Sequence, residues 1–310
     1  MPTRHRNLSA ILLALVSCFA FAGDECFATP QAERAAEQLA RGKALVDAGG
    51  CAGCHTTDAA KPFAGGKRID TPFGAIYSRN LTQDRETGLG GWSDDDFYRA
   101  LRFGVAPDGS RYYPAFPYPN FSKLTRQDIA AIRAHLATLT PVENSPPPPD
   151  LRWPLNYRVL MRGWNWLFFR PGVLMPDQQK SAEWNRGRYL VEGPGHCGAC
   201  HTPKNVFGAD KRGQALAGGL VQGKSAPRLD GAGGLKSWSV DDIAQYLQSG
   251  RNGRSHTGEL LSEVAVNSTS GMSDTDVRAI AAYLKDLPAG APEPVVNPPP
   301  STSEPRTTAR

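Results

Sequence analysis

Two five-residue stretches of this chain share one pattern. Cys51–His55 reads Cys-Ala-Gly-Cys-His, and Cys197–His201 reads Cys-Gly-Ala-Cys-His. Cys-x-x-Cys-His is the attachment motif for a c-type haem. Positions i and i+3 of a helical turn share a face, so both thiols reach the vinyl groups of one porphyrin, and the next histidine is the proximal iron ligand. The pattern predicts two covalently attached haem c groups, held by Cys51, Cys54, Cys197 and Cys200, with His55 and His201 on the irons.

A Cys-x-x-Cys pair has other uses: half of a zinc site, a redox dithiol or a structural disulfide. Zinc favours closed sets of four ligands, yet the two pairs lie 146 residues apart and each has its own adjacent histidine. A dithiol enzyme needs neither that histidine nor a second copy. The haem interpretation is therefore favoured for both motifs.

The amino terminus predicts export through a signal peptide over residues 1–22. Arg4 and Arg6 form a basic start, Leu8 to Phe21 an apolar core, and Ala20-Phe21-Ala22 a small-x-small cleavage site. Two alternatives are that the segment is retained as a membrane anchor, or that the chain is lipidated at Cys18. Export fits haem-bound cysteines; we assign no role to Cys26. We expect a periplasmic protein, or one at the periplasmic face of the inner membrane.

Charge and hydropathy exclude some partners. The net charge of +5 falls to +3 once Arg4 and Arg6 leave with the signal. No basic run or basic–aromatic stripe points to nucleic acid. No internal apolar run reaches about 20 residues, so we expect no transmembrane helix in the mature chain.

The sequence is internally duplicated. Trp92-Ser93 recurs as Trp238-Ser239, and Gly104 recurs as Gly250, each 146 residues on. Helical patterns cover 31–48, 93–103 and 125–139 in the first copy, with Ser93 and Thr125 as N-caps. The second copy repeats the last two from Ser239 and Ser273. One unit has been used twice.

The segment between the copies has two parts. Pro146 to Pro149 are four consecutive prolines in an extended spacer. Residues 157–169 (YRVLMRGWNWLFF) predict a short aromatic helix that packs between the copies. A more specific interpretation is that this helix associates with a membrane surface or docks a partner. The tail from Pro288 is rich in Pro, Ser and Thr, and we expect it to be disordered.

A sixth iron ligand, methionine or histidine, sets the potential of electron-transfer haems. Apart from the expected signal, the methionines are Met161, Met175 and Met272, and the non-proximal histidines are His135, His196 and His256. Met272, the only methionine downstream of the second motif, and Met161 are the candidates. A packing role for Met272 is the alternative.

Residues 41 to 287 resemble the multi-haem cytochrome c subunits that accompany membrane-bound alcohol, gluconate and related dehydrogenases of bacteria. The resemblance rests on TPFGAIYSRNLTQDRETGLGGWSDDDFYRAL, RYYPAFPYPNF, RGWNWLFF and WNRGRYLVEGPGHCGACHTPKN. It implies a dehydrogenase subunit as electron donor. The expected fold is all-α: two tandem class I cytochrome c domains at 31–140 and 183–288, joined by a Pro-rich linker and aromatic helix at 141–182, with a tail at 289–310.

Two departures from the family concern its iron ligands. Where the first unit of the family often has methionine within Tyr-Pro-Ala-Met-Pro-Tyr, this chain has Phe116. Where the second unit often reads Met-Ala-Glu-Val, this chain reads Leu261-Ser262-Glu263-Val264. Neither Phe116 nor Leu261 can bind iron, so either Met161 and Met272 substitute, or one haem is open on its distal face.

The sequence therefore favours an exported dihaem cytochrome c without bond chemistry of its own. It would pass electrons from a dehydrogenase to a quinone, another cytochrome or an oxidase. The alternative is a dihaem enzyme, of the peroxidase or thiosulfate-oxidising type, with one open iron. A haem-based ligand sensor ranks lower, because no output domain is visible.

Overall fold

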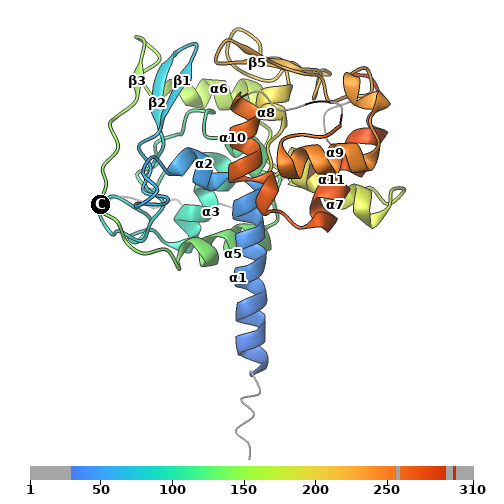
Figure 1. Cartoon of the computed structure of the whole chain (residues 1–310). Coiled ribbons are helices and arrows are strands. Elements are labelled where there is room, and N and C mark those ends of the chain that lie inside the picture. Colours follow the sequence, from blue (N-terminus) through green and yellow to red (C-terminus); the bar gives the residue numbers. More distant parts are fainter. Residues whose placement is uncertain (1–28, 254, 256–258, 291–295, 298–310) are drawn as a thin grey trace, which may run out of the picture. The chain divides into compact units, whose positions relative to one another are not determined.

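The computed structural model describes residues 29–253, 255, 259–290 and 296–297 (Figure 1). The expected signal peptide, with Cys18, and also Cys26 and His256 lie outside the described residues, as does most of the expected tail at 289–310. No described helix is long and apolar enough to cross a membrane.

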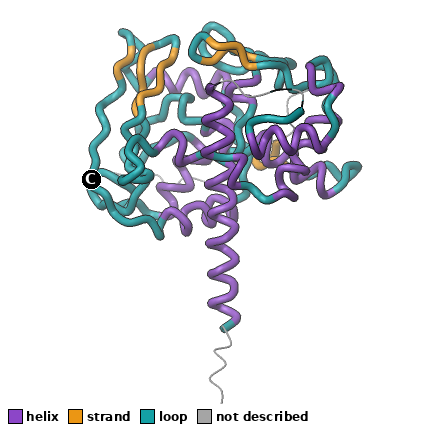
Figure 2. The backbone as a smooth tube through the Cα atoms, viewed as in Figure 1, coloured by secondary structure: helices purple, strands orange, loops and turns teal. Residues whose placement is uncertain are grey.

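The described secondary structure is mainly helical, with short strands between the helices (Figure 2). The α-helices are α1 (Pro30–Ala48), α2 (Cys51–His55), α3 (Asp94–Phe103), α4 (Tyr118–Phe121), α5 (Arg126–Leu136), α6 (Leu160–Phe168), α7 (Ala182–Glu192), α8 (Gly198–His201), α9 (Val240–Ser249), α10 (Glu259–Asn267) and α11 (Asp274–Asp286). Two 3₁₀ turns are η1 (Gly234–Ser237) and η2 (Thr269–Gly271). The strands are β1 (Arg68–Thr71), β2 (Gly74–Tyr77), β3 (Asp150–Leu151), β4 (Val173–Leu174), β5 (Gly219–Val221), β6 (Lys224–Ala226) and β7 (Val296–Asn297).

The predicted all-α fold of two tandem domains is wrong in two respects. First, the strands form antiparallel sheets in the orders β1-β2-β3, β4-β7 and β5-β6. Second, backbone contacts divide the chain into Met1–Glu37 and Gln38–Arg310, so both haem motifs lie in one compact unit. The limits of the two domains within the chain stay a prediction.

The strands form because each motif is followed by a hairpin, which the helical periodicity did not reveal. In the second copy, Val221 and Lys224 pair across Gln222 and Gly223, whose φ angles are 49° and 77°. Two consecutive residues with positive φ make the tight turn that suits the twist of a hairpin. The Gln-Gly pair was the local signal for this turn.

The helices predicted from end signals are confirmed. Ser93 and Ser239 each accept a hydrogen bond from the backbone N–H of the third residue of the helix that follows, an aspartate, whose carboxylate accepts one from the backbone N–H of the cap. Thr125 and Ser273 cap α5 and α11 with their side chains. These reciprocal bonds satisfy amide groups that a helix start otherwise leaves unpaired.

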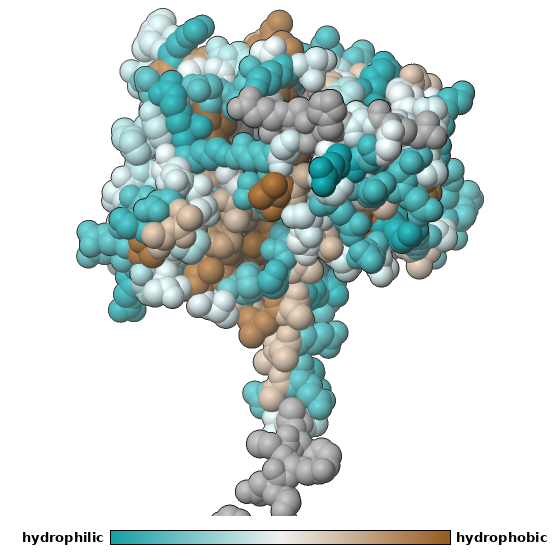
Figure 3. All heavy atoms as spheres, viewed as in Figure 1, coloured by the Kyte–Doolittle hydropathy of each residue, from teal (hydrophilic) through white to brown (hydrophobic). Residues whose placement is uncertain are grey.

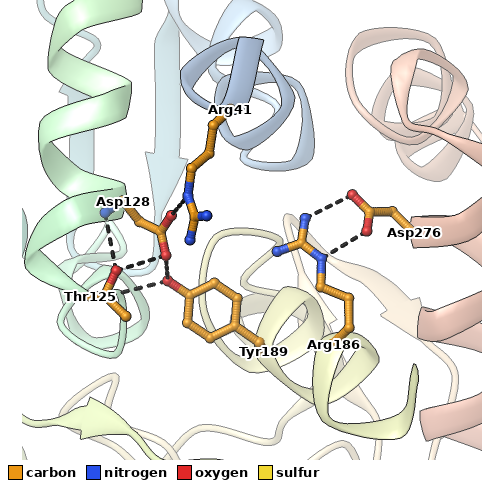
Figure 4. A network of polar contacts seen from close by, with 6 residues as sticks. All are labelled: Arg41, Thr125, Asp128, Arg186, Tyr189 and Asp276. Atoms are coloured by element: carbon orange, nitrogen blue, oxygen red, sulfur yellow. Dashed lines mark hydrogen bonds and ion pairs between the residues drawn. The ribbon is translucent and has the colours of Figure 1, made fainter. Parts of the chain in front are cut away.

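In each repeat, the first and last helices cross where a glycine removes the side chain between them. A Cβ atom on Gly42 in α1 would clash with the carbonyl oxygen of Ala131 in α5, and one on Gly187 in α7 would clash with that of Ala279 in α11. The residue before each glycine is an arginine that binds an aspartate of the partner helix. The pairs are Arg41–Asp128 at 2.5 Å and Arg186–Asp276 at 2.7 and 2.8 Å (Figure 4).

Two hydrophobic clusters lie in the compact unit, and each contains a residue of the other repeat. The cluster of α3 and α5 has Tyr189 of the second repeat packed against it. The cluster of α7 and α11 includes Ala48 of the first repeat. The Tyr189 hydroxyl also donates to the Asp128 carboxylate and accepts from the Thr125 amide at 3.1 Å (Figure 4). This exchange of residues explains why the repeats are not separate domains.

The predicted spacer is bound along its length rather than free. Asn80 donates to Val142 O at 2.7 Å, Asn144 donates to Ala64 O at 2.7 Å, and β3 extends the β1-β2 sheet. The predicted aromatic helix is α6. Its Asn165 accepts from the Tyr118 hydroxyl at 2.5 Å, and its Trp164 donates to Phe207 O at 2.9 Å. The helix therefore contacts both repeats, as predicted.

We expect Gly42→Ala and Gly187→Ala each to lower the free energy of unfolding by about 1–3 kcal/mol, because the added methyl group forces the crossing helices apart. Gly163→Ala is the matched control. Gly163 is also within a helix, but a Cβ atom there would meet nothing within 4 Å. Because alanine is the better helix former, the control should be neutral or stabilised by about 0.5–1 kcal/mol. Chemical denaturation followed by circular dichroism measures all three; equal losses would contradict the close crossing.

Candidate functional site

The two Cys-x-x-Cys-His motifs form the short helices α2 and α8. Gly50, with a φ of 56°, lets the chain turn from α1 into α2, and Gly53 N donates to Gly50 O at 3.0 Å. In α8, His201 N donates to Cys197 O at 2.9 Å. A helical turn places the two cysteines of each motif on one face. The local backbone therefore has the form that the motif predicts.

The two motif histidines make the same hydrogen bond. His55 Nδ1 lies 2.6 Å from Arg79 O, and His201 Nδ1 lies 2.7 Å from Pro227 O. A carbonyl oxygen can only accept, so each Nδ1 carries the proton, and Nε2 of the neutral ring keeps its lone pair. Burial lowers the pKa of both rings, which favours this neutral form. Iron-binding and zinc-binding histidines are commonly oriented in this way by a backbone carbonyl.

Among the four motif cysteines, Cys51, Cys197 and Cys200 are half-buried and Cys54 is more exposed. Burial raises the pKa of Cys51 and of Cys197 to about 12, and it also raises the pKa of Cys54 and Cys200. A redox dithiol needs an accessible thiolate, hence a lowered pKa. A thioether has no charge and suits apolar surroundings. The thiols therefore fit haem attachment better than a redox dithiol.

A zinc site also lacks ligands. Within the described residues, no three His, Cys, Asp or Glu side chains gather where they could share a metal ion. Each motif offers one imidazole and two thiols, which are fewer than the four ligands of a closed zinc site. A closed four-ligand zinc site is therefore not formed by the described part of the chain.

Apolar side chains surround each motif. Cys51 packs against the cluster of α3 and α5, and Cys197 against that of α7 and α11. In Figure 3, apolar residues reach the surface over α3 and α5, beside α2. A porphyrin needs an apolar wall of this kind on both faces, so the surroundings fit the group that the motifs predict.

A lysine caps each motif, which the sequence did not indicate. Lys67 donates to Gly53 O at 2.8 Å and pairs with Glu263. Lys204 donates to Gly198 O at 3.1 Å and pairs with Asp210. These charges act on the second cysteine of each motif. Burial raises the pKa of Cys54, Lys67 lowers it, and Glu263 raises it. Each site thus has an ion pair at its edge.

The two motifs lie close together. Beyond the effects of burial and Lys204, Cys54 raises the pKa of Cys200, so the thiols of the two motifs interact electrostatically. His196 Nε2 donates to Gly49 O at 3.2 Å, and Ser268 Oγ donates to Ala48 O at 3.1 Å. These bonds hold the segment entering α2 against the second repeat. Helix α10 also packs on α2.

The two positions where the family often has methionine are apolar here and packed. The ring of Phe116 lies 5.3 Å from that of Tyr112 and 5.6 Å from that of Phe121. Leu261 is half-buried in α10. No sulfur is available at either position.

The remaining methionines differ in environment. Met161 is buried in α6, one turn after Arg158, whose guanidinium lies over the rings of Tyr112 and Tyr113. It therefore lies near the segment that contains Phe116. Met272 is buried in the cluster that Cys197 packs against. Met175 is exposed.

The other described histidines have structural contacts. His196 donates to Gly49, and its ring meets that of Phe121 at 5.7 Å. His135 is half-buried in α5 at the crossing with Gly42. Neither is placed as an obvious iron ligand.

The comparisons with known proteins agree with the site. A family model described as "Cytochrome c" matches residues 39–140. The chain is 40% identical to a diheme cytochrome c-type protein of Cereibacter sphaeroides over 265 residues, covering 81% of this chain and 86% of that protein.

Two further relatives are longer than this chain. One is the gluconate 2-dehydrogenase cytochrome c subunit of Pantoea cypripedii, 39% identical over 92% of this chain and 65% of the relative. The other is a nicotinate dehydrogenase subunit of Pseudomonas putida, 46% identical over 81% of this chain. The chain spans about a fifth (21%) of that longer relative.

Proposed function

The chain belongs to the family of bacterial cytochromes c that includes the diheme cytochrome c-type protein and the gluconate 2-dehydrogenase cytochrome c subunit, and from this premise we propose a dihaem electron relay. Electron transfer through covalently bound haem c is the function of this family. The relay takes electrons from a dehydrogenase subunit and delivers them to a quinone, another cytochrome or an oxidase of the respiratory chain. It works in the periplasm or at the periplasmic face of the inner membrane.

One observation carries the number of two haems: both motif histidines are held in the same ligand-ready form. His55 and His201 each donate from Nδ1 to a backbone carbonyl, at 2.6 and 2.7 Å, which leaves Nε2 for iron. A motif that had lost its haem would have no reason to keep this orientation. The cysteines Cys51, Cys54, Cys197 and Cys200 would attach the two groups.

Haem c, when bound, supplies a one-electron iron couple. The chain supplies the surroundings that set its potential: apolar burial, the hydrogen bond to the histidine, and nearby charge. The close placement of the two motifs, where His196 Nε2 lies 3.2 Å from Gly49 O and α10 packs on α2, supports a short path from one site to the other. An electron entering at one site would leave from the other without a second docking event.

Intact mass and carbon monoxide binding test this function. The exported protein should weigh two haems more than its mature polypeptide. Cys51→Ser with Cys54→Ser should remove one haem, and Cys197→Ser with Cys200→Ser the other. With both irons six-coordinate, carbon monoxide should leave the reduced spectrum unchanged. A wild-type mass with one haem would contradict the dihaem relay.

A dihaem enzyme with one open iron is the second candidate. It is supported by Phe116 and Leu261, which place ring and aliphatic carbon where the family often has methionine sulfur. In that case carbon monoxide would shift the spectrum of one haem only, and that haem would be high-spin before the gas is added. The same measurement therefore separates a relay from an enzyme or a ligand sensor.

The distal ligands are proposed to be Met161 for the first haem and Met272 for the second. Met161→Leu and Met272→Leu nearly keep the side-chain volume, so a packing role predicts an unchanged spectrum. A ligand role predicts a lower potential for one haem and loss of its sulfur-to-iron band. Met175→Leu, at an exposed methionine, is the control. For Met272 packing is the alternative that this test addresses, because its counterpart, 148 residues earlier, is the core residue Leu124.

We further expect the ion pair at the first motif to tune its haem with opposite signs. A positive charge nearby stabilises the reduced, less positive iron. Lys67→Met should therefore lower the midpoint potential of one haem, and Glu263→Gln should raise it. Both side chains are partly exposed, so screening limits each change to about threefold in the oxidised-to-reduced ratio at fixed potential, or about 28 mV for one electron.

A spectroelectrochemical titration measures these shifts. Lys180→Met is the control, since Lys180 pairs with Asp286 and is not among the charges that act on the motif cysteines. Its two potentials should match the wild type. Shifts of the same sign for Lys67→Met and Glu263→Gln would contradict the electrostatic explanation and point to a structural change.

A further inference from the structure

Large apolar side chains stand in solvent on and beside α6. Within the described residues, Trp153 is 78% exposed, Trp166 is 76% exposed and Phe207 is 61% exposed. Together with five further side chains that are more than two-fifths exposed, they form a set that we call the α6 surface. It consists of Trp153, Tyr157, Val159, Leu160, Trp166, Leu167, Val206 and Phe207.

Contacts between three segments make the α6 surface continuous. Trp164 of α6 donates to Phe207 O at 2.9 Å, and the Phe168 and Phe207 rings lie 5.7 Å apart. Tyr157 N donates to Pro154 O at 3.1 Å, which connects Trp153 to the start of α6. The exposed apolar side chains therefore come from segments that are bound to one another rather than from scattered parts of the chain.

Helix α6 buries a polar side chain and exposes large apolar ones, which is the reverse of an ordinary surface helix. Its two buried side chains are Met161 and the polar Asn165, whose Oδ1 accepts from the Tyr118 hydroxyl at 2.5 Å. Its outward face has Leu160, Trp166 and Leu167. A helix that buries an amide and exposes large aliphatic and indole groups is adapted to an apolar neighbour outside the molecule.

The charge beside this face is mainly positive, and Asp210, a carboxylate that lies beside Leu167, is paired with Lys204. Residues 151–176 contain four arginines and no aspartate, glutamate or lysine. Arg152, Arg162 and Arg170 are exposed. Lys211 and Arg212 add positive charge beside Leu167, and Arg212 donates to Leu167 O at 3.5 Å. The α6 surface is therefore apolar with a cationic border.

We propose that the α6 surface binds the anionic phospholipid face of a membrane. Indole, phenol and guanidinium groups prefer the zone between headgroups and acyl chains. The exposed side chains of Trp153 and Trp166 can enter that zone directly. A protein partner would need a complementary cleft to receive them. The cationic border is attracted by anionic headgroups. The inference extends the proposed membrane-face location, and it does not depend on the electron path.

Co-sedimentation of the haem-loaded full chain with vesicles tests the proposal. The chain is expressed as Cys18→Ser, so that no acyl group at that residue contributes. Binding to vesicles of phosphatidylglycerol and phosphatidylcholine should exceed binding to phosphatidylcholine alone by at least tenfold, and salt should weaken it. Trp153→Ser with Trp166→Ser should lower the affinity for anionic vesicles at least tenfold.

Two control pairs separate this surface from general effects. Leu220→Ser with Val266→Ser removes two apolar side chains of similar exposure elsewhere and should change nothing. Arg152→Gln with Arg162→Gln should weaken anionic binding, whereas Arg34→Gln with Arg85→Gln, at arginines outside the surface, should do so much less. Unchanged haem content and unfolding temperature establish that each variant is folded.

Several outcomes would overturn the proposal. They are absence of wild-type binding to anionic vesicles, equal binding by the tryptophan variant, and equal losses in both arginine pairs. Absence of vesicle binding, combined with a slower electron transfer from a dehydrogenase in the tryptophan variant alone, would assign the surface to a protein partner. Haem reduction measured in solution reports separately on the relay, so the two proposals fail independently.

Discussion

The close crossing of the first and last helix in each repeat positions everything else. Gly42 and Gly187 let the helix backbones touch the carbonyl groups of Ala131 and Ala279, and an arginine–aspartate pair fixes the angle beside each glycine. The haem motif begins nine residues after Gly42 and ten after Gly187. Because so short a segment leaves little freedom, the crossing determines where the thiols and the imidazole of each motif lie. The hydrogen bonds from His55 and His201 to backbone carbonyls then fix the ring orientation.

The same crossing also joins the two repeats, through residues that the duplication does not share. Asp128 is bound by Arg41 of its own repeat and by Tyr189 of the other, whereas its counterpart Asp276 is bound by Arg186 (Figure 4). Burial alone would raise the pKa of Asp128, but the bonds from Arg41, Tyr189 and Thr125 lower it below its ordinary value. The carboxylate thus stays ionised in a largely buried place, where an unpaired charge would be costly. The Asp128 carboxylate therefore stabilises both the helix crossing within its own repeat and the contact between the two repeats.

The sequence predicted what depends on local signals and failed where distant residues decide. The motifs, the capped helices from Ser93 and Thr125, and the aromatic helix α6 all follow from short patterns, and the structure has them. The prediction of separate all-α domains was wrong, and its all-α part failed on a local signal, because helical periodicity does not report hairpin turn residues such as Gln222 and Gly223. The exchange of Ala48 and Tyr189 between the clusters has no sequence signature. The contact of Lys67 was missed for the same reason, because Lys67 meets a carboxylate 196 residues away.

The two sites have become different through helix α10. In the second repeat the charge that pairs with the lysine, Asp210, comes from the loop that follows the motif itself. In the first it is Glu263, which α10 contributes from the second repeat while its neighbour Asn267 lies against Gly53. Any displacement of α10 therefore changes the field at the first motif directly and leaves the Lys204–Asp210 pair at the second intact. Because α10 also contains Leu261, at the position where the family often has the second unit's iron ligand, this one helix would contribute to the surroundings of both haems.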